Sequence, residues 1–115
     1  MIRLAIPDAP GEDAGVARPT RLDDAELASG LAALPAWRRE GDVIRRSIET
    51  PSFADAIALV TRIGFAAEAA DHHPDLDVRW RTVHVALTTH DAGGLTRLDL
   101  ELAGAVDAAA RGVGA

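Results

Sequence analysis

The chain has 115 residues, of which 48% are hydrophobic and 26% are charged, so it can form one domain around one hydrophobic core. Its 12 basic and 18 acidic residues give a net charge of −6, which argues against a protein that binds nucleic acid through its overall charge. Cysteine is absent, and this excludes disulfides, thiolate catalysis and cysteine-ligated metal sites.

The sequence has no feature typical of a membrane or secreted protein. No apolar run approaches the roughly 20 residues that span a bilayer. Residues 1–14 include Asp8, Glu12 and Asp13, and they lack the basic and then apolar regions of a signal peptide. We therefore expect a cytoplasmic protein that makes no contact with membranes.

The first 20 residues show no sustained periodicity and are rich in proline and glycine. We interpret residues 1–20 as an N-terminal extension that is mostly irregular, with a short strand at Ile2–Ile6. Residues 21–112 are expected to form the folded domain.

The first helix is predicted to begin after Asp23, because Asp23 and Glu26 stand at the N-cap and N3 positions of a capping box. Pro35 ends this helix. Segments 36–40 and 43–49 flank a Gly-Asp pair and are predicted to form a β-hairpin. The apolar face of the helix consists of Leu27, Leu31 and Leu34.

A second helix follows Ser52, which pairs with Asp55 in the same N-cap pattern. It is expected to end near Ala70, because Pro74 lies just beyond. Its apolar positions form a wide face that suits packing on a sheet. They are Phe53, Ile57, Val60, Gly64 and Ala67, with Ala56, Leu59, Ile63, Ala66 and Ala70 beside them.

The last part of the chain is predicted to contain strands at 78–80 and 82–89, a loop at 91–94 and a final helix. A capping box that begins at Thr96 opens this helix, which reaches about Arg111. The order α-β-β-α-β-β-α therefore predicts an antiparallel sheet with helices on one side, an α+β fold.

The four histidines all lie within residues 72–90. His72 and His73 are adjacent, His84 lies on the polar face of a predicted strand, and His90 follows that strand. Glu68 precedes His72 by one helical turn. Because histidine titrates near neutral pH, imidazoles beside carboxylates suit a reaction that adds one proton and removes another, as a dehydration does.

Two other interpretations of these histidines stay open at this point. Three histidines and a carboxylate could hold zinc, but the spacing of known zinc motifs is absent. Histidines can also lie scattered on a surface without a shared role. Spacing alone does not decide between these interpretations.

Two blocks of sequence carry a resemblance to a known family. Residues 67–75 contain the His-His-Pro block, and residues 83–96 contain the Thr-His-Asp-x-Gly-Gly-Leu-Thr block, with Asp99 three residues after its last threonine. At this separation the blocks resemble the signature of the pterin-4a-carbinolamine dehydratases. The likeness covers residues 22–106.

The resemblance implies a two-layer α/β sandwich, with a four-stranded antiparallel sheet and helices packed on one side. It implies the dehydration of a 4a-hydroxytetrahydropterin to the quinonoid dihydropterin, which regenerates the pterin after aromatic amino-acid hydroxylation. No metal or cofactor is expected, and the chain is expected to form a homodimer or homotetramer. The alternative is a binding, assembly or dimerisation module that uses the same fold without catalysis.

The resemblance also implies roles for individual residues. His72, His73 and His90 fall on the catalytic positions. The supporting or substrate-binding positions fall on Glu68, Asp99 and Trp37, with Trp37 as the residue that stacks on the pterin ring. Each of these three also has a structural alternative. Glu68 could be an exposed helix residue, Asp99 a helix-capping residue and Trp37 a core residue. We expect His84 to serve packing or an interface rather than catalysis.

Overall fold

The computed structural model describes residues 2–3 and 19–115 of the chain. In chain order its elements are β1 (Ile2–Arg3), α1 (Asp24–Leu31), β2 (Arg38–Glu40), β3 (Val43–Glu49), α2 (Phe53–Ala70), β4 (Asp75–Arg79), β5 (Thr82–Leu87), the 3-10 turn η1 (His90–Ala92) and α3 (Arg97–Gly112).

The strands form one antiparallel sheet in the order β1-β4-β5-β3-β2. The four strands from β2 to β5 are the predicted four-stranded sheet, and β1 adds two residues at the edge beside β4. The register places Ser47, His84 and Asp77 side by side on β3, β5 and β4. One row of side chains therefore crosses the three central strands.

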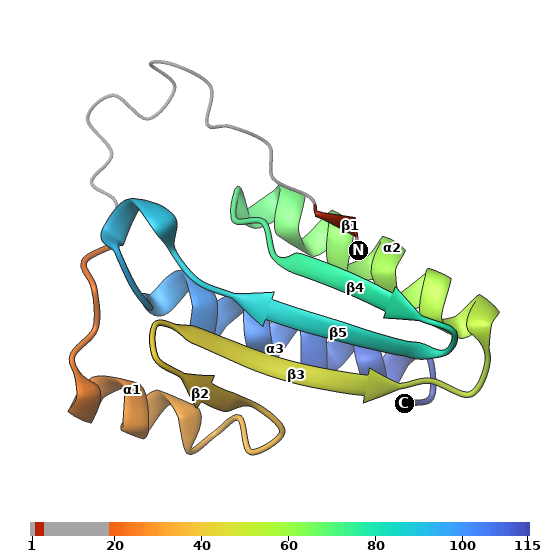
Figure 1. Cartoon of the computed structure of the whole chain (residues 1–115), viewed down its shortest axis with the longest axis horizontal. Coiled ribbons are helices and arrows are strands. Elements are labelled where there is room, and N and C mark those ends of the chain that lie inside the picture. Colours follow the sequence, from red (N-terminus) through yellow and green to blue (C-terminus); the bar gives the residue numbers. More distant parts are fainter. Residues whose placement is uncertain (1, 4–18) are drawn as a thin grey trace.

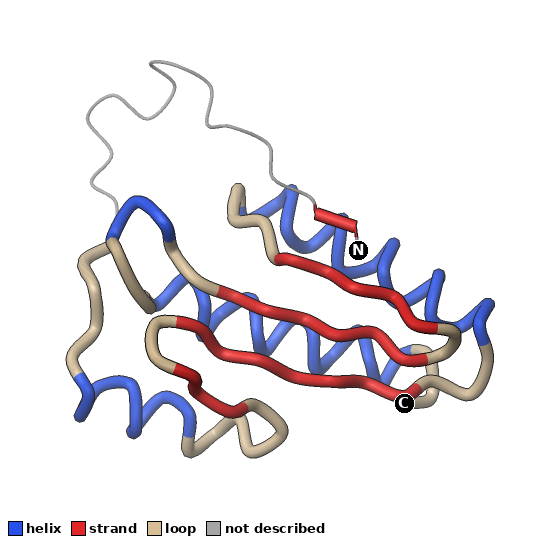
Figure 2. Tube along the Cα trace, in the orientation of Figure 1, coloured by secondary structure: helices blue, strands red, loops and turns tan. Residues whose placement is uncertain are grey.

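Helices α2 and α3 both lie on one face of the sheet, while α1 lies beside β2 at the sheet edge (Figures 1 and 2). Alternate residues of the strands point to the helices and are buried, as for Ile44 and Ile48 on β3. Leu59 and Ile63 of α2 and Val106 of α3 complete this core. The prediction that Phe53 and Ile57 of α2 also pack on the sheet is wrong, because both are exposed. The α+β sandwich with helices on one side is thus confirmed.

The helices begin where the sequence predicts. Asp23 and Glu26 form a full capping box at α1, and so do Thr96 and Asp99 at α3. The side chain of Ser52 accepts the backbone N–H of Asp55 at the start of α2. Each cap satisfies backbone donors that the first turn of a helix leaves without partners.

Some boundaries differ from those predicted. β4 begins at Asp75 rather than Val78, and β5 ends at Leu87 rather than Thr89. The chain leaves β5 because Thr89 instead pairs with Gly94, which closes the loop that contains η1.

Of the strand predicted at Ile2–Ile6, the first two described residues form β1, and residues 4–6 lie outside the described part of the chain. Most of the predicted irregular extension at residues 1–20 lies outside it too. No helix within residues 19–115 is long and apolar enough to cross a bilayer.

Candidate active site

The histidine doublet lies between the end of α2 and the start of β4. Asp71 at the helix C-cap adopts a left-handed conformation with φ of 49°. The N–H of Asp71 donates to the carbonyl of Glu68, and the N–H of His72 donates to that of Ala67, so the last turn is closed. From this turn His72 enters the interior, with 8% of its surface exposed.

His72 is held by a carboxylate inside the protein. Its Nε2 lies 2.6 Å from Oδ1 of Asp99, which has no exposed surface. Because a carboxylate accepts hydrogen bonds, Nε2 carries the hydrogen and Nδ1 is the ring nitrogen left for other partners. Asp99 therefore fixes both the orientation and the tautomer of this imidazole.

The other oxygen of Asp99 accepts two more hydrogen bonds. The hydroxyl of Thr89 donates to Oδ2 at 2.7 Å, and the backbone N–H of Thr96 donates to it at 2.9 Å. The hydroxyls of Thr89 and Thr96 are themselves 2.9 Å apart. Three donors thus stabilise a buried carboxylate that would otherwise cost several kcal/mol to remove from water.

His73 has a carboxylate partner of its own. Its Nε2 lies 2.9 Å from Oε1 of Glu68, one turn back on α2. The side chain of His73 is 9% exposed, whereas that of Glu68 is 61% exposed. The doublet thus presents two imidazoles that are each 9% exposed and are bonded to different carboxylates, Asp99 inside the protein and Glu68 at the surface.

His90 is exposed and opens the η1 turn directly after Thr89. Since Thr89 bonds to Asp99, which bonds to His72, two hydrogen bonds and one peptide link join His90 to the doublet. Of the predicted site residues, the structure thus bonds His72 to Asp99 and His73 to Glu68, and it places His90 directly after the residue that bonds to Asp99.

Trp37 lies elsewhere in the fold. It is only 6% exposed and belongs to the hydrophobic core. Its indole N–H donates to Oδ1 of Asp107 on α3 at 2.8 Å. Its predicted contact with a pterin ring stays a prediction, and the observed contacts are those of a core residue.

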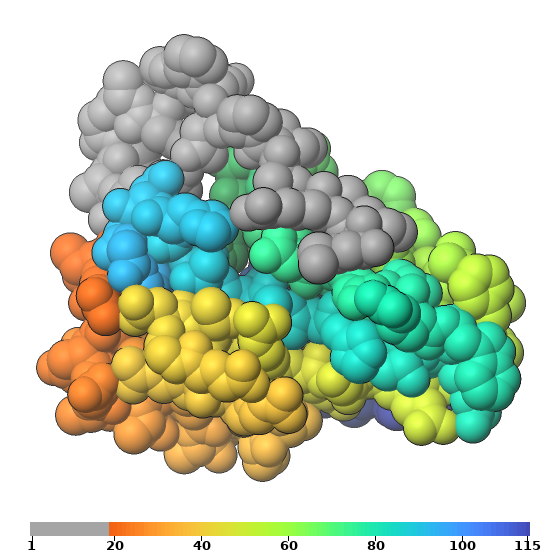
Figure 3. Space-filling view, viewed as in Figure 1, coloured from red at the N-terminus to blue at the C-terminus, as the bar shows by residue number. Residues whose placement is uncertain are grey.

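His84 is separate from the other three histidines. It lies on the open face of the sheet, opposite to the helices, and its Nδ1 is 2.7 Å from the hydroxyl of Ser47. Figure 3 shows this face, which exposes side chains of β3, β4 and β5. The expected role of His84 in packing or an interface stays a prediction.

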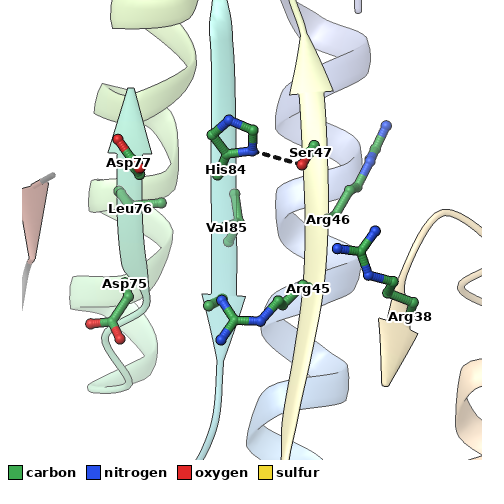
Figure 4. A pocket seen from close by; sticks show the side chains of 10 residues that line it. Arg38, Arg45, Arg46, Ser47, Asp75, Leu76, Asp77, His84 and Val85 are labelled. Carbon is green, nitrogen blue, oxygen red and sulfur yellow. Dashed lines mark hydrogen bonds between the residues drawn. The ribbon is translucent and has the colours of Figure 1, made fainter. Parts of the chain in front are cut away.

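A hollow of about 280 Å³ surrounds His84 on this face, between the rows of side chains drawn in Figure 4. Arg38 and Arg45 line one side of it, and Asp75 and Asp77 line the other. A hydrogen bond from Arg79 holds the pKa of Asp77 below its usual value. His72, His73 and His90 do not line this hollow, so the hollow is distinct from the site around the histidine doublet.

Within residues 2–3 and 19–115, no three histidine or acidic side chains are grouped so that they could hold a metal ion together.

Sequence reasoning missed Thr89 and Thr96 as members of the site. A signal was present, because Thr89 continues the alternation of Val83, Val85 and Leu87 and therefore points to the buried face. A buried hydroxyl next to a candidate catalytic residue needs a polar partner. Asp107, the partner of Trp37, gave no comparable signal.

Comparison with known proteins identifies close relatives. Residues 20–109 match the family model described as Pterin 4 alpha carbinolamine dehydratase. A protein of Roseiflexus sp. (strain RS-1) is 54% identical over 88 residues, which cover 76% of this chain and 95% of the relative. A protein of Nocardia farcinica (strain IFM 10152) is 53% identical over 90 residues, which cover 78% of this chain and 95% of the relative. Both carry the name "Putative pterin-4-alpha-carbinolamine dehydratase".

Two solved structures share the fold. The transcriptional coactivator/pterin dehydratase from Brucella melitensis is 32% identical, with a TM-score of 0.77, and the match covers 79% of this chain and 99% of that one. A pterin dehydratase-like protein, identified as a RuBisCO assembly factor in the alpha-carboxysome, is 22% identical with a TM-score of 0.57, over 65% of this chain and 89% of its own. The second likeness concerns the fold alone. With its histidine doublet and both carboxylates inside the matched residues, the chain belongs to the pterin-4-alpha-carbinolamine dehydratase family.

Proposed function

We propose that this protein dehydrates a 4a-hydroxytetrahydropterin to the quinonoid dihydropterin, by histidine acid–base catalysis and without a metal or cofactor. The observation that carries the proposal is the doublet itself, in which His72 and His73 are each bonded to a separate carboxylate. Membership of the dehydratase family supports the choice of reaction.

The proposed reaction needs one proton donor and one proton acceptor. The C4a–O bond breaks as the hydroxyl takes a proton and leaves as water, and N5 loses a proton as the C4a=N5 double bond forms. One imidazole of the doublet acts as the acid toward the hydroxyl, while His90 or the other imidazole accepts the N5 proton. Asp99 and Glu68 hold the doublet in orientation, and Glu68 is exposed enough to contact the pterin ring as well.

The test is a dehydration assay on freshly generated 4a-hydroxytetrahydropterin, with a metal chelator present. His73→Ala and His90→Ala are expected to lower the rate by about 100- to 10,000-fold each, the usual contribution of a general acid or base. His84→Ala is the matched control, because His84 lies on the open face, and it is expected to keep the activity. If the folded parent protein does not exceed the spontaneous rate, the proposal is wrong.

A binding or assembly role is the second candidate. It is favoured by the names of two solved structures with this fold, a transcriptional coactivator/pterin dehydratase and a pterin dehydratase-like RuBisCO assembly factor. The presence of the full histidine set favours the enzyme over this role. A neighbouring gene for an aromatic amino-acid hydroxylase would support pterin recycling in the cytoplasm, whereas a neighbouring assembly operon would support the module.

We also propose that the protein acts as a homodimer or homotetramer. The support is a line of exposed hydrophobic side chains along α2, formed by Phe53, Ile57 and Phe65. They are spaced by four and eight residues and so share one face of the helix. Apolar side chains of this size at the surface often mark a contact between proteins.

A further inference from the structure

Thr89 is a buried polar residue to which none of the roles above assigns a function. Only 3% of its surface is exposed, yet its hydroxyl lies within hydrogen-bond distance of both Asp99 and Thr96. A hydroxyl has one hydrogen, and that of Thr89 goes to Asp99. The hydroxyl of Thr96 must therefore donate to Thr89, while its own oxygen accepts the N–H of Leu98.

These bonds run in one direction, from the first turn of α3 to the carboxylate of Asp99, which also accepts the hydrogen bond of His72. Leu98 donates to Thr96, Thr96 to Thr89, and Thr89 to Asp99. No buried side-chain polar atom of the described residues lacks a partner, so each of these donors is already committed. Removal of the Thr89 hydroxyl would leave one oxygen of Asp99 short of a donor and the hydroxyl of Thr96 without its acceptor.

The backbone of Thr89 holds the turn that carries His90. Its N–H donates to the carbonyl of Gly94, and its carbonyl accepts the N–H groups of Ala92 and Gly94. Its side chain is fixed in the interior at the same time. Thr89 thus bonds to Asp99, the carboxylate that holds His72, and it also immediately precedes His90.

We propose that Thr89 is a positioning residue for the dehydration, which orders the Asp99–His72 pair through its hydroxyl and sets the place of His90 through its backbone. This proposal rests on the proposed function. Thr89 does not touch the reacting atoms; it acts through Asp99. Its loss should therefore lower kcat more than it changes KM, since the carboxylate that orients the imidazole is disturbed while substrate contacts are kept.

The experiment compares variants that change the hydroxyl and the methyl group of Thr89 separately. Thr89→Val keeps the shape and removes the donor, and Thr89→Ser keeps the donor and removes a methyl group. We expect Thr89→Val to lower kcat by about 10- to 100-fold, by analogy with the loss of an outer hydrogen-bond partner of a metal-bound histidine. Thr89→Ser is expected to keep most of the kcat of the parent protein. The matched control is Thr88→Val, because Thr88 instead bonds to the backbone of Asp42.

A second readout does not depend on catalysis. The ring N–H of His72, shielded and bonded to Asp99, should give a slowly exchanging proton resonance in the parent protein. We expect this resonance to be shifted or lost in Thr89→Val and kept in Thr89→Ser and Thr88→Val. If Thr89→Val does not fold, the pair Thr89→Ala and Thr89→Ser, which differ by the hydroxyl oxygen, replaces it.

The outcomes separate this proposal from the proposed function. If the parent is active and folded Thr89→Val keeps both kcat and the His72 resonance, Thr89 has no positioning role, although the dehydratase stands. If the parent is inactive, the dehydratase fails, and the resonance alone decides whether Thr89 orders the Asp99–His72 pair. A Thr89→Val variant that loses only thermal stability would likewise overturn the proposal.

Discussion

The indole of Trp37 and the carboxylate of Asp107 form a hydrogen bond of 2.8 Å between residues that are 70 positions apart. The same oxygen of Asp107 also accepts a hydrogen bond from Arg46 of β3. Trp37 thereby joins the segment before β2 to α3, and Arg46 joins β3 to the same carboxylate of α3. This single carboxylate connects three parts of the fold.

Replacement of Trp37 by Phe should destabilise the protein. The hydrogen bond and part of the core packing would be lost, and a cost of about 1–3 kcal/mol in the free energy of unfolding is expected. Chemical denaturation measures this loss of stability. Trp80→Phe is the control, because Trp80 is exposed and its replacement should change the stability little. A rise in KM of about tenfold or more with unchanged stability would instead establish that Trp37 contacts the substrate.

Replacement of Asp99 by Asn should lower kcat without preventing folding. The amide has one acceptor oxygen, which can still face Thr89 and the N–H of Thr96, so its NH₂ would face His72 and favour the opposite tautomer. A comparable change in serine hydrolases costs about 10,000-fold, and we expect a loss of about 100-fold or more here. Steady-state kinetics and circular dichroism test this, and an active Asp99→Asn variant would show that the tautomer does not matter.

The stability should depend on pH through Glu40. The hydrogen bond from Arg38, followed by the charges of Arg38 and Arg45, lowers the pKa of Glu40 below its usual 4.5. Since the folded-state pKa is the lower one, the stabilisation is present above the unfolded value and is lost as the pH falls through the folded value. Glu40→Gln should therefore lower Tm at pH 7 and match the parent at strongly acidic pH.

The effect of Glu40 should also weaken in high salt, because the group is exposed to solvent. Tm measured at low and high salt concentration gives this comparison. An equal difference in Tm between parent and Glu40→Gln at every pH would contradict an ionic cause.

Replacement of Phe65 by Ser should reduce self-association. Phe65 is 74% exposed on α2, so the change removes apolar surface from a possible contact and leaves the core intact. Sedimentation velocity over a range of concentrations measures the expected shift toward monomer, with Thr61→Ser on the same face as the control. A parent that is monomeric at every concentration would rule out the proposed assembly.

Much of the fold could be predicted because local chemistry agrees with the global arrangement. The three N-caps at Asp23, Ser52 and Thr96 lie where their side-chain patterns place them. The alternation of Val83, Val85 and Leu87 correctly predicted the buried face of β5. Such signals involve residues a few positions apart, and they need no knowledge of distant contacts.

The site was harder to predict, because its bonds join distant residues. His72 and Asp99 are 27 positions apart, and nothing between them indicates that one would bond to the other. Their grouping came from the family resemblance rather than from spacing. The resemblance did not reveal that Thr89 donates to Asp99, nor that the indole of Trp37 bonds to a helix in the core.

The shortness of the two edge strands affects how the protein behaves at high concentration. β2 has three residues and β1 has two, so each edge offers few unpaired backbone groups to another chain. Beyond the two residues that β1 covers, β4 carries the charged side chains of Asp77 and Arg79. Short and charged edges disfavour the strand-to-strand pairing that starts aggregation. The described edges of the sheet therefore offer little backbone for fibril-like growth.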